Sequence, residues 1–164
     1  MHGDKTRGIR GTRIILLMTD NEITFRIRGA IFDVYNELGP GLLESIYEEA
    51  LIVALKNRGL NVEQQVSVPV IFQGKRLPCD YRIDILVEKR VIIELKSVQE
   101  VKNVFHLQLL TYMKISKIHI GILVNFNCDN INNNIFRKII WLSLFSSSSL
   151  DGITKPTDYT DDTD

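Results

Sequence analysis

The sequence lacks an excess of charge of either sign. Its 164 residues include 20 Lys and Arg and 20 Asp and Glu, so the formal net charge is zero. A chain with no global positive field does not by itself indicate a polyanionic partner. A nucleic acid would therefore have to be held by a local basic surface or through metal ions, and the zero net charge counts mildly against such a ligand.

Cysteine and long apolar runs are also scarce. The two cysteines, Cys79 and Cys128, show no CxxC or Cys/His spacing, which argues against a structural zinc site and against a disulfide framework. The apolar run at 14–18 is too short for a signal peptide, and no segment reaches the length of a membrane span. We therefore expect a soluble, cytoplasmic protein with reduced thiols and no membrane partner.

The composition is that of one globular domain, with 45% apolar and 24% charged residues. Residues 1–19 have no clear periodicity and are expected to form a disordered extension, with Met18 as an alternative start. Residues 20–145 are expected to form the domain. Residues 146–164 are rich in Ser and Asp, which predicts a disordered tail.

Hydrophobic periodicity predicts alternating helices and strands within the domain. Helices are expected at 23–38, 43–58 and 104–116, strands at 60–72, 81–87, 91–98 and 117–126, and a last strand or short helix at 135–145. Pro69 indicates an edge position or a bulge in the first strand. Helices on both sides of the strands predict an α/β fold, a three-layer α/β/α sandwich with a mixed central sheet.

One predicted core strand, VIIELKSV at 91–98, contains an acid and an amine. Glu94 and Lys96 share a face because side chains alternate along a strand. Pairing Val87 with Val91 across the preceding turn would place Asp84 opposite Glu94. Two carboxylates at such a distance destabilise a sheet unless one is protonated or a cation lies between them. A divalent metal is the simplest answer.

Magnesium suits this arrangement, because it binds one or two carboxylates and keeps waters for a phosphate-bearing substrate. A metal-bound water becomes a nucleophile, and an adjacent lysine can orient it or stabilise the transition state. Two acids and an amine on neighbouring strands therefore indicate phosphodiester hydrolysis.

These residues resemble a known family, the PD-(D/E)XK nuclease superfamily, whose fold is restriction-endonuclease-like. Asp84 is followed ten residues later by Glu94-Leu95-Lys96 and then by a helix with Gln108. The stretch GLLESIY at 41–47 is similar to the signature of one branch, the GxxExxY proteins. The resemblance covers about 21–126 and includes the blocks ELGPGLLESIYEEAL, YRIDILV, IIELKSV and QLLTYM.

The resemblance implies a role for each matching residue. Asp84, Glu94 and the backbone carbonyl of Leu95 would bind Mg²⁺ or Mn²⁺, and Lys96 would assist the attacking water. Glu44 and Gln108 would complete the catalytic set. The expected nucleic-acid contacts are Arg82, which would share a face with Asp84, and two aromatic residues, Tyr47 and Tyr112.

One position departs from this pattern. Members of the GxxExxY branch commonly carry a histidine three residues before the glutamine, where this chain has Phe105. His106 is adjacent but would point about 100° away on a helix. His119, in the apolar run at 117–126, is expected to be a core histidine.

Simpler interpretations stay open for several of these residues. Asp84, Glu94 and Lys96 can form a surface salt bridge on a half-exposed sheet. Glu44 can interact with the dipole of its helix, and Glu48 or Glu49 can serve equally well at the site. Tyr47 and Tyr112 can be core or rim aromatics, and Arg82 can form an ion pair with Asp84.

The expected activity is metal-dependent hydrolysis of nucleic acid, with DNA as the preferred candidate and a homodimer as a possible assembly. The alternative is a nuclease fold without cleavage activity that binds nucleic acid or acts as an assembly module. A third possibility is a hydrolase of a small phosphorylated molecule.

Overall fold

The computed structural model describes residues 18–141, which form three α-helices, five strands and one 3₁₀ turn. In chain order these are α1 (Asp20–Leu38), α2 (Glu44–Asn57), β1 (Val62–Phe72), β2 (Lys75–Val87), β3 (Val91–Lys96), α3 (Asn103–Ser116), β4 (Ile120–Asn125), η1 (Ile131–Asn134) and β5 (Ile135–Ile139). The predicted disordered tail at 146–164 and residues 1–17 of the predicted disordered extension at 1–19 lie outside the described residues, whereas Thr19 is the N-cap of α1. No helix in the described part of the chain is long and apolar enough to cross a membrane.

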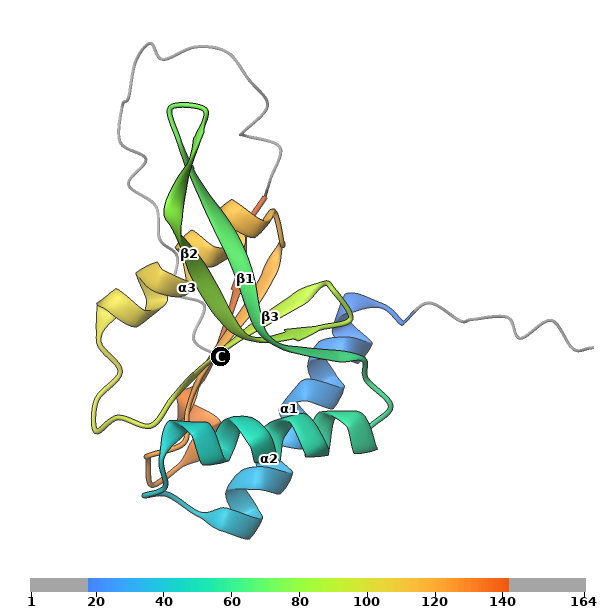
Figure 1. Ribbon diagram of the computed structural model, residues 1–164. Coiled ribbons are helices and arrows are strands. Elements are labelled where there is room, and N and C mark those ends of the chain that lie inside the picture. Colours follow the sequence, from blue (N-terminus) through green and yellow to red (C-terminus); the bar gives the residue numbers. More distant parts are fainter. Residues whose placement is uncertain (1–17, 142–164) are drawn as a thin grey trace, which may run out of the picture.

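The strands form one mixed sheet in the order β1-β2-β3-β4-β5. β3 and β4 are parallel, because α3 carries the chain back between them, and the other neighbouring strands are antiparallel. Figure 1 shows α1 and α2 on one side of the sheet and α3 on the other. The predicted three-layer fold with a mixed sheet is confirmed.

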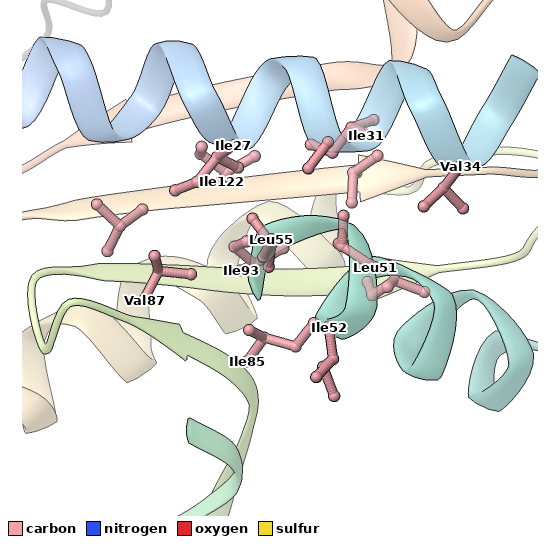
Figure 2. Packing of buried hydrophobic residues seen from close by; sticks show 14 of the residues in the cluster. Ile27, Ile31, Val34, Leu51, Ile52, Leu55, Ile85, Val87, Ile93 and Ile122 are labelled. Carbon is pink, nitrogen blue, oxygen red and sulfur yellow. The ribbon is translucent and has the colours of Figure 1, made fainter. Parts of the chain in front are cut away.

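The larger core lies between the sheet and the first two helices. Apolar residues of α1 recur every three or four positions, so one face of the helix is buried. Figure 2 shows Ile27 and Ile31 of α1, Leu51 and Leu55 of α2 and Ile93 of β3 in this layer. The arrangement fixes α2, and with it the acids of its first turns, against the sheet.

The smaller core lies between the sheet and α3. Ile92 of β3 and Leu123 of β4 pack there against Leu109 and Met113 of α3. Gly121 lets the helix approach closely, because a Cβ at this position would lie 2.6 Å from the sulfur of Met113.

Two predicted strand boundaries change most, and the last element, predicted as a strand or a short helix, is also defined by the structure. β2 begins at Lys75 rather than at 81, because Gln73 and Gly74 form a tight turn with φ of 49° and 75°, and β1 pairs with β2 up to that turn. Figure 1 shows the result as a long twisted hairpin that rises beyond the rest of the sheet. β3 ends at Lys96, and the last element is a strand.

Candidate active site

Glu94 and Lys96 lie at the end of β3, on the face toward α3. Both are buried, at 1% and 9% exposure. The Lys96 Nζ donates a hydrogen bond of 2.6 Å to Glu94 Oε1. The second carboxylate oxygen, Glu94 Oε2, is buried and has no hydrogen-bond partner among the described residues. A buried acceptor without a partner is costly, so this oxygen is available to a ligand.

Asp84 joins this pair from β2. The predicted pairing of Val87 with Val91 is confirmed, but the ladder between β2 and β3 ends at Ile85 and Ile93, one pair before Asp84 and Glu94. Where the strands separate, Asp84 Oδ2 accepts a hydrogen bond of 2.8 Å from the Leu95 backbone N–H. The structure therefore brings the two carboxylates together without pairing them directly.

Burial dominates the protonation of these groups. It raises the pKa of Asp84 to about 6, although the Leu95 N–H and the charge of Lys96 act in the opposite direction. Burial, aided by the charge of Asp84, raises the pKa of Glu94 to about 7. Burial also acts to lower the pKa of Lys96, but the carboxylates of Glu94, Glu44 and Asp84 together outweigh it, so that pKa is raised. Two acids with raised pKa values beside a protonated amine are typical of a functional site.

Two acids of α2 complete the negative side of the site. Glu44 Oε1 lies 3.9 Å from Lys96 Nζ. Glu48, one turn further along, is 8% exposed, accepts a hydrogen bond of 2.6 Å from Gln65 Nε2 and contributes to raising the pKa of Asp84. The sequence predicts Glu44 at the site, with Glu48 as an alternative. The two acids are four residues apart, so both lie on one face of the helix. Glu49 is exposed and bonds instead to Gln64.

α3 covers the other side of Lys96. The ring of Phe105, the residue at the expected histidine position, lies with its centroid 5.4 Å from Lys96 Nζ. Gln108 Nε2 donates a hydrogen bond of 2.6 Å to the hydroxyl of Tyr112. Tyr112 is 6% exposed and its ring contacts that of Tyr81. The charges of Glu94, Asp84 and Lys96 act on the hydroxyl of Tyr112, and Gln108 is joined to the site through that hydroxyl. The Tyr112 ring is not open to stacking by a base.

The expected contact between Tyr47 and nucleic acid needs correction. Tyr47 is 0% exposed and its ring stacks on Phe126 at 4.6 Å. Its hydroxyl donates a 2.6 Å hydrogen bond to the carbonyl of Gly39 and accepts a 3.1 Å bond from Leu42 N–H. Tyr47 therefore holds the loop that leads into Glu44 and does not present its ring to a ligand.

The expected shared face of Arg82 and Asp84 is also wrong. Tyr81 and Ile83, the neighbours of Arg82, both lie on the α3 side. Strict alternation breaks between Ile83, which lies in the smaller core, and Ile85, which lies in the larger one. Gln65, with a φ of 52°, lies in β1 between the residues that pair with these two. Arg82 is exposed, and its binding of nucleic acid stays a prediction.

Neither histidine near this region belongs to the carboxylate cluster. His106 packs edge-on against Phe136 at 4.9 Å, in agreement with its predicted direction away from the site. Burial lowers the pKa of His106. The prediction that His119 is a core residue is wrong, because β4 begins only at Ile120 and His119 is exposed.

Asp84 and Glu94 suit a divalent metal, because both offer carboxylate oxygens and each has an oxygen that is not fully used in hydrogen bonds. Asp84 uses one carboxylate oxygen on Leu95, and Glu94 keeps Oε2 without a partner. Within 18–141, no three His, Cys, Asp or Glu side chains already converge as a preformed metal cage. A site of two carboxylates, a carbonyl and waters is the kind that Mg²⁺ prefers.

The mixed sheet, its two helical layers and the acids gathered at the end of β3 define a restriction-endonuclease-like α/β domain. Residues 21–138 match the family described as the PD-(D/E)XK nuclease superfamily, which is more than half of the chain. The chain therefore belongs to the PD-(D/E)XK nuclease superfamily.

Two further comparisons complete these findings. A solved structure described as "Crystal structure of SSO0001" is 26% identical with a TM-score of 0.47, and the match covers 58% of this chain and 48% of that one. The chain thus spans about half the length of that protein. No curated protein matches the chain significantly.

Proposed function

We propose that this protein is a metal-dependent nuclease that hydrolyses phosphodiester bonds of DNA with Mg²⁺ or Mn²⁺. The observation that carries the proposal is that the two carboxylate oxygens of Glu94 have different surroundings. Oε1 accepts a hydrogen bond from Lys96, whereas Oε2 is buried beside Asp84 without a partner among the described residues. A purely structural ion pair would leave no such oxygen unsatisfied.

Asp84, Glu94 and the Leu95 carbonyl would hold the metal. When bound, a divalent ion acidifies water and neutralises charge on a phosphoryl oxygen. Because Leu95 N–H holds one oxygen of Asp84, that carboxylate is oriented before any ligand arrives.

Lys96 acts in this proposal as a fixed cation and not as a general base. Its pKa is raised by Glu94, so the amine keeps its proton at neutral pH. Its Nζ lies between Glu94 and Glu44, where it can orient an attacking water and stabilise charge developing on the phosphate. Phe105 shields one side of the amine from water, which strengthens that electrostatic effect.

Within the superfamily, the GxxExxY branch accounts best for the motif at 41–47. Gly41 has a φ of 98°, which favours glycine. Glu44 reaches Lys96, and Tyr47 ties down the loop between Gly39 and Leu42. Each of these three signature residues thus has a structural role that supports the candidate active site.

The test combines Mn²⁺ calorimetry with nicking of supercoiled plasmid, on the wild type, on Glu94→Ala and on the matched control Glu49→Ala. Glu49 is an exposed acid of α2 outside the cluster. We expect Glu94→Ala to lose Mn²⁺ binding and to lower nicking by at least a hundredfold, while Glu49→Ala retains both. Equal nicking by Glu94→Ala and the wild type would overturn the proposal.

A second function is favoured by one observation, the absence of a preformed cage of three acidic, His or Cys ligands within 18–141. In this alternative, Lys96 neutralises Glu94 permanently and the domain binds nucleic acid or assembles with a partner without cutting. It predicts no Mn²⁺ binding by the wild type and DNA binding that survives the combined loss of Asp84 and Glu94.

A further inference from the structure

A second charged region lies at the opposite end of the sheet from the carboxylates. Two hollows of ≈ 260 Å³ and ≈ 490 Å³ share Asp20, His119 and Ile120 and so adjoin one another. We call them together the basal cleft. They lie where β3 and β4 begin, whereas Glu94 and Lys96 lie where β3 ends.

Cations dominate the lining of the basal cleft. Its charged residues are Lys89, Arg90, Lys117, Arg137 and Asp20. The single acid among them, Asp20, forms an ion pair with Arg90, which also donates a 2.6 Å hydrogen bond to the carbonyl of Met18. Lys89 and Lys117 are exposed and form no salt bridge with a described residue. In a chain of zero net charge, this is a local positive field of the kind that attracts phosphate.

The backbone holds two of these lysines in an unusual conformation. Lys89, in the turn between β2 and β3, has a φ of 55°, and Lys117, after α3, has a φ of 57°. Asn or Gly adopts this left-handed region more easily than Lys does. Two separate turns therefore each use a strained lysine to line the same hollow.

An aromatic side chain stands beside these cations. Trp141, the only tryptophan of the sequence, lines the larger hollow with His119 and Arg137 and is 79% exposed. A large exposed aromatic ring next to cations is the combination with which proteins bind single strands, through stacking on a base and contacts to phosphates.

We propose that the basal cleft is a second binding site for a single-stranded segment of nucleic acid, with a base on Trp141 and phosphates at Lys89 and Lys117. That this strand is the substrate rests on the proposed nuclease function, whereas the binding itself does not. The five steps along β3 from Val91 to Lys96 span about 17 Å, which is the least distance that a strand reaching from the cleft to the carboxylates would have to cover. The cleft would hold a strand while the distant site cuts it.

The experiment measures binding in EDTA, so that no hydrolysis is needed. Because Trp141 is the only tryptophan, its fluorescence reports on the cleft when unlabelled dT12 is titrated into the full chain. We expect saturable quenching. Anisotropy of fluorescein-labelled dT12 should show roughly tenfold weaker binding for Trp141→Ala and for the double variant Lys89→Asn/Lys117→Asn. Asparagine suits the left-handed backbone, so the double variant should remain folded.

Lys56→Gln is the matched control, since Lys56 is an exposed lysine of α2 that does not line either hollow. Its affinity should equal that of the wild type. The slope of log K against the logarithm of the salt concentration should also become less steep by about 1.4 in the double variant, because two phosphate contacts are lost. Unchanged dT12 affinity in both cleft variants would overturn the inference. Equal affinity for dTMP and dT12 would also overturn it and would assign the cleft to a free nucleotide.

The outcomes separate this inference from the proposed function. A chain that binds dT12 at the cleft but nicks no plasmid with Mn²⁺ contradicts the nuclease proposal alone. A chain that nicks plasmid but shows no change in Trp141 fluorescence with dT12 contradicts the cleft alone.

Discussion

At the scale of single residues, Glu94 has surroundings that a structural acid would not need. One oxygen is held by Lys96 at 2.6 Å, and the other is buried without a partner. Replacing a buried ion pair by apolar residues is often neutral or stabilising. The retention of a charged pair with a free oxygen in the core therefore suggests a role in chemistry rather than in folding.

The raised pKa of Glu94 predicts that this acid destabilises the fold as the pH rises. Burial raises its pKa to about 7, whereas in the unfolded chain it returns to about 4.3. Between these values the folded state binds more protons, so stability present at low pH is lost as the pH rises through 7. Glu94→Gln should gain unfolding free energy relative to the wild type by on the order of 2 kcal/mol from pH 5 to pH 8. Urea unfolding in EDTA measures this difference.

Asp84, whose pKa is about 6, contributes in the same direction and remains in both proteins, so the wild type should show the steeper decline. Parallel pH profiles would mean that Glu94 is ionised already at pH 5 and held by Lys96 as a permanent ion pair.

Single residues also mark the limit of what the sequence can predict. The sequence spacing was sufficient to predict that Asp84, Glu94 and Lys96 lie together, because strand alternation and one turn determine their positions. It was not sufficient for Tyr47, whose burial depends on Phe126, a residue far along the chain. The contact of Phe105 with Lys96 depends on the angle of α3, which no local pattern contains.

At the scale of elements, the position of α3 determines what covers Lys96. The helix approaches β4 at Gly121, where an added Cβ would lie 2.6 Å from Met113 Sδ and 2.7 Å from Leu109 Cδ1. Both atoms belong to a buried layer with little room to move. A larger residue at 121 must therefore displace the helix, and with it Phe105.

Gly121→Ala should cost about 1–3 kcal/mol of unfolding free energy by overpacking. By moving α3 away from the sheet, it should also lower the maximal rate of plasmid nicking. The DNA concentration that gives half of this rate should change less. Thermal unfolding and nicking at saturating DNA check the two effects.

Gly29→Ala is the matched control within α1. Its Cβ would meet the guanidinium end of Arg58, which is flexible and can move aside. Alanine is also the better helix former, so this substitution should be within about 1 kcal/mol of neutral. Equal losses in both variants would contradict the close approach of α3.

The hairpin of β1 and β2 shows why element boundaries were harder to predict than element types. Residues 75–80 carry no strict alternation, so the sequence predicted no strand there. Pairing with β1 overrides this local pattern once Gln73 and Gly74 turn the chain. The face prediction for Arg82 failed because strict alternation does not hold between Ile83 and Ile85, which pack into different cores.

At the scale of the whole molecule, zero net charge conceals an uneven distribution. Glu44, Glu48, Asp84 and Glu94 gather at one end of the sheet, and the cations of the basal cleft lie at the other. The composition predicted the absence of a global field correctly, but it contains no information on where the charges lie. The mild argument against a nucleic-acid ligand therefore loses its force in the folded chain.

A bound divalent metal should stabilise the whole domain. Mn²⁺ at a hundred times its dissociation constant should add about 2.7 kcal/mol. For a chain of this size this raises Tm by about 5–11 °C. Differential scanning calorimetry with Mn²⁺ and after EDTA should show this shift for the wild type. The shift should be absent in Glu94→Ala, and an equal shift in that variant would place the metal elsewhere.

The two sides of the candidate active site belong to elements with different local stability. β3 is buried along all six of its residues, so its amide hydrogens exchange with solvent only when the whole domain unfolds. Glu44 sits in the first turn of α2, whose N-cap Leu43 provides no side-chain hydrogen bond, so the loop before this turn is held instead by the hydroxyl of Tyr47, through Gly39 and Leu42. Lys96 and Glu94 thus stay in place as long as the domain is folded, whereas the entry of the chain to Glu44 depends on two hydrogen bonds of one tyrosine hydroxyl.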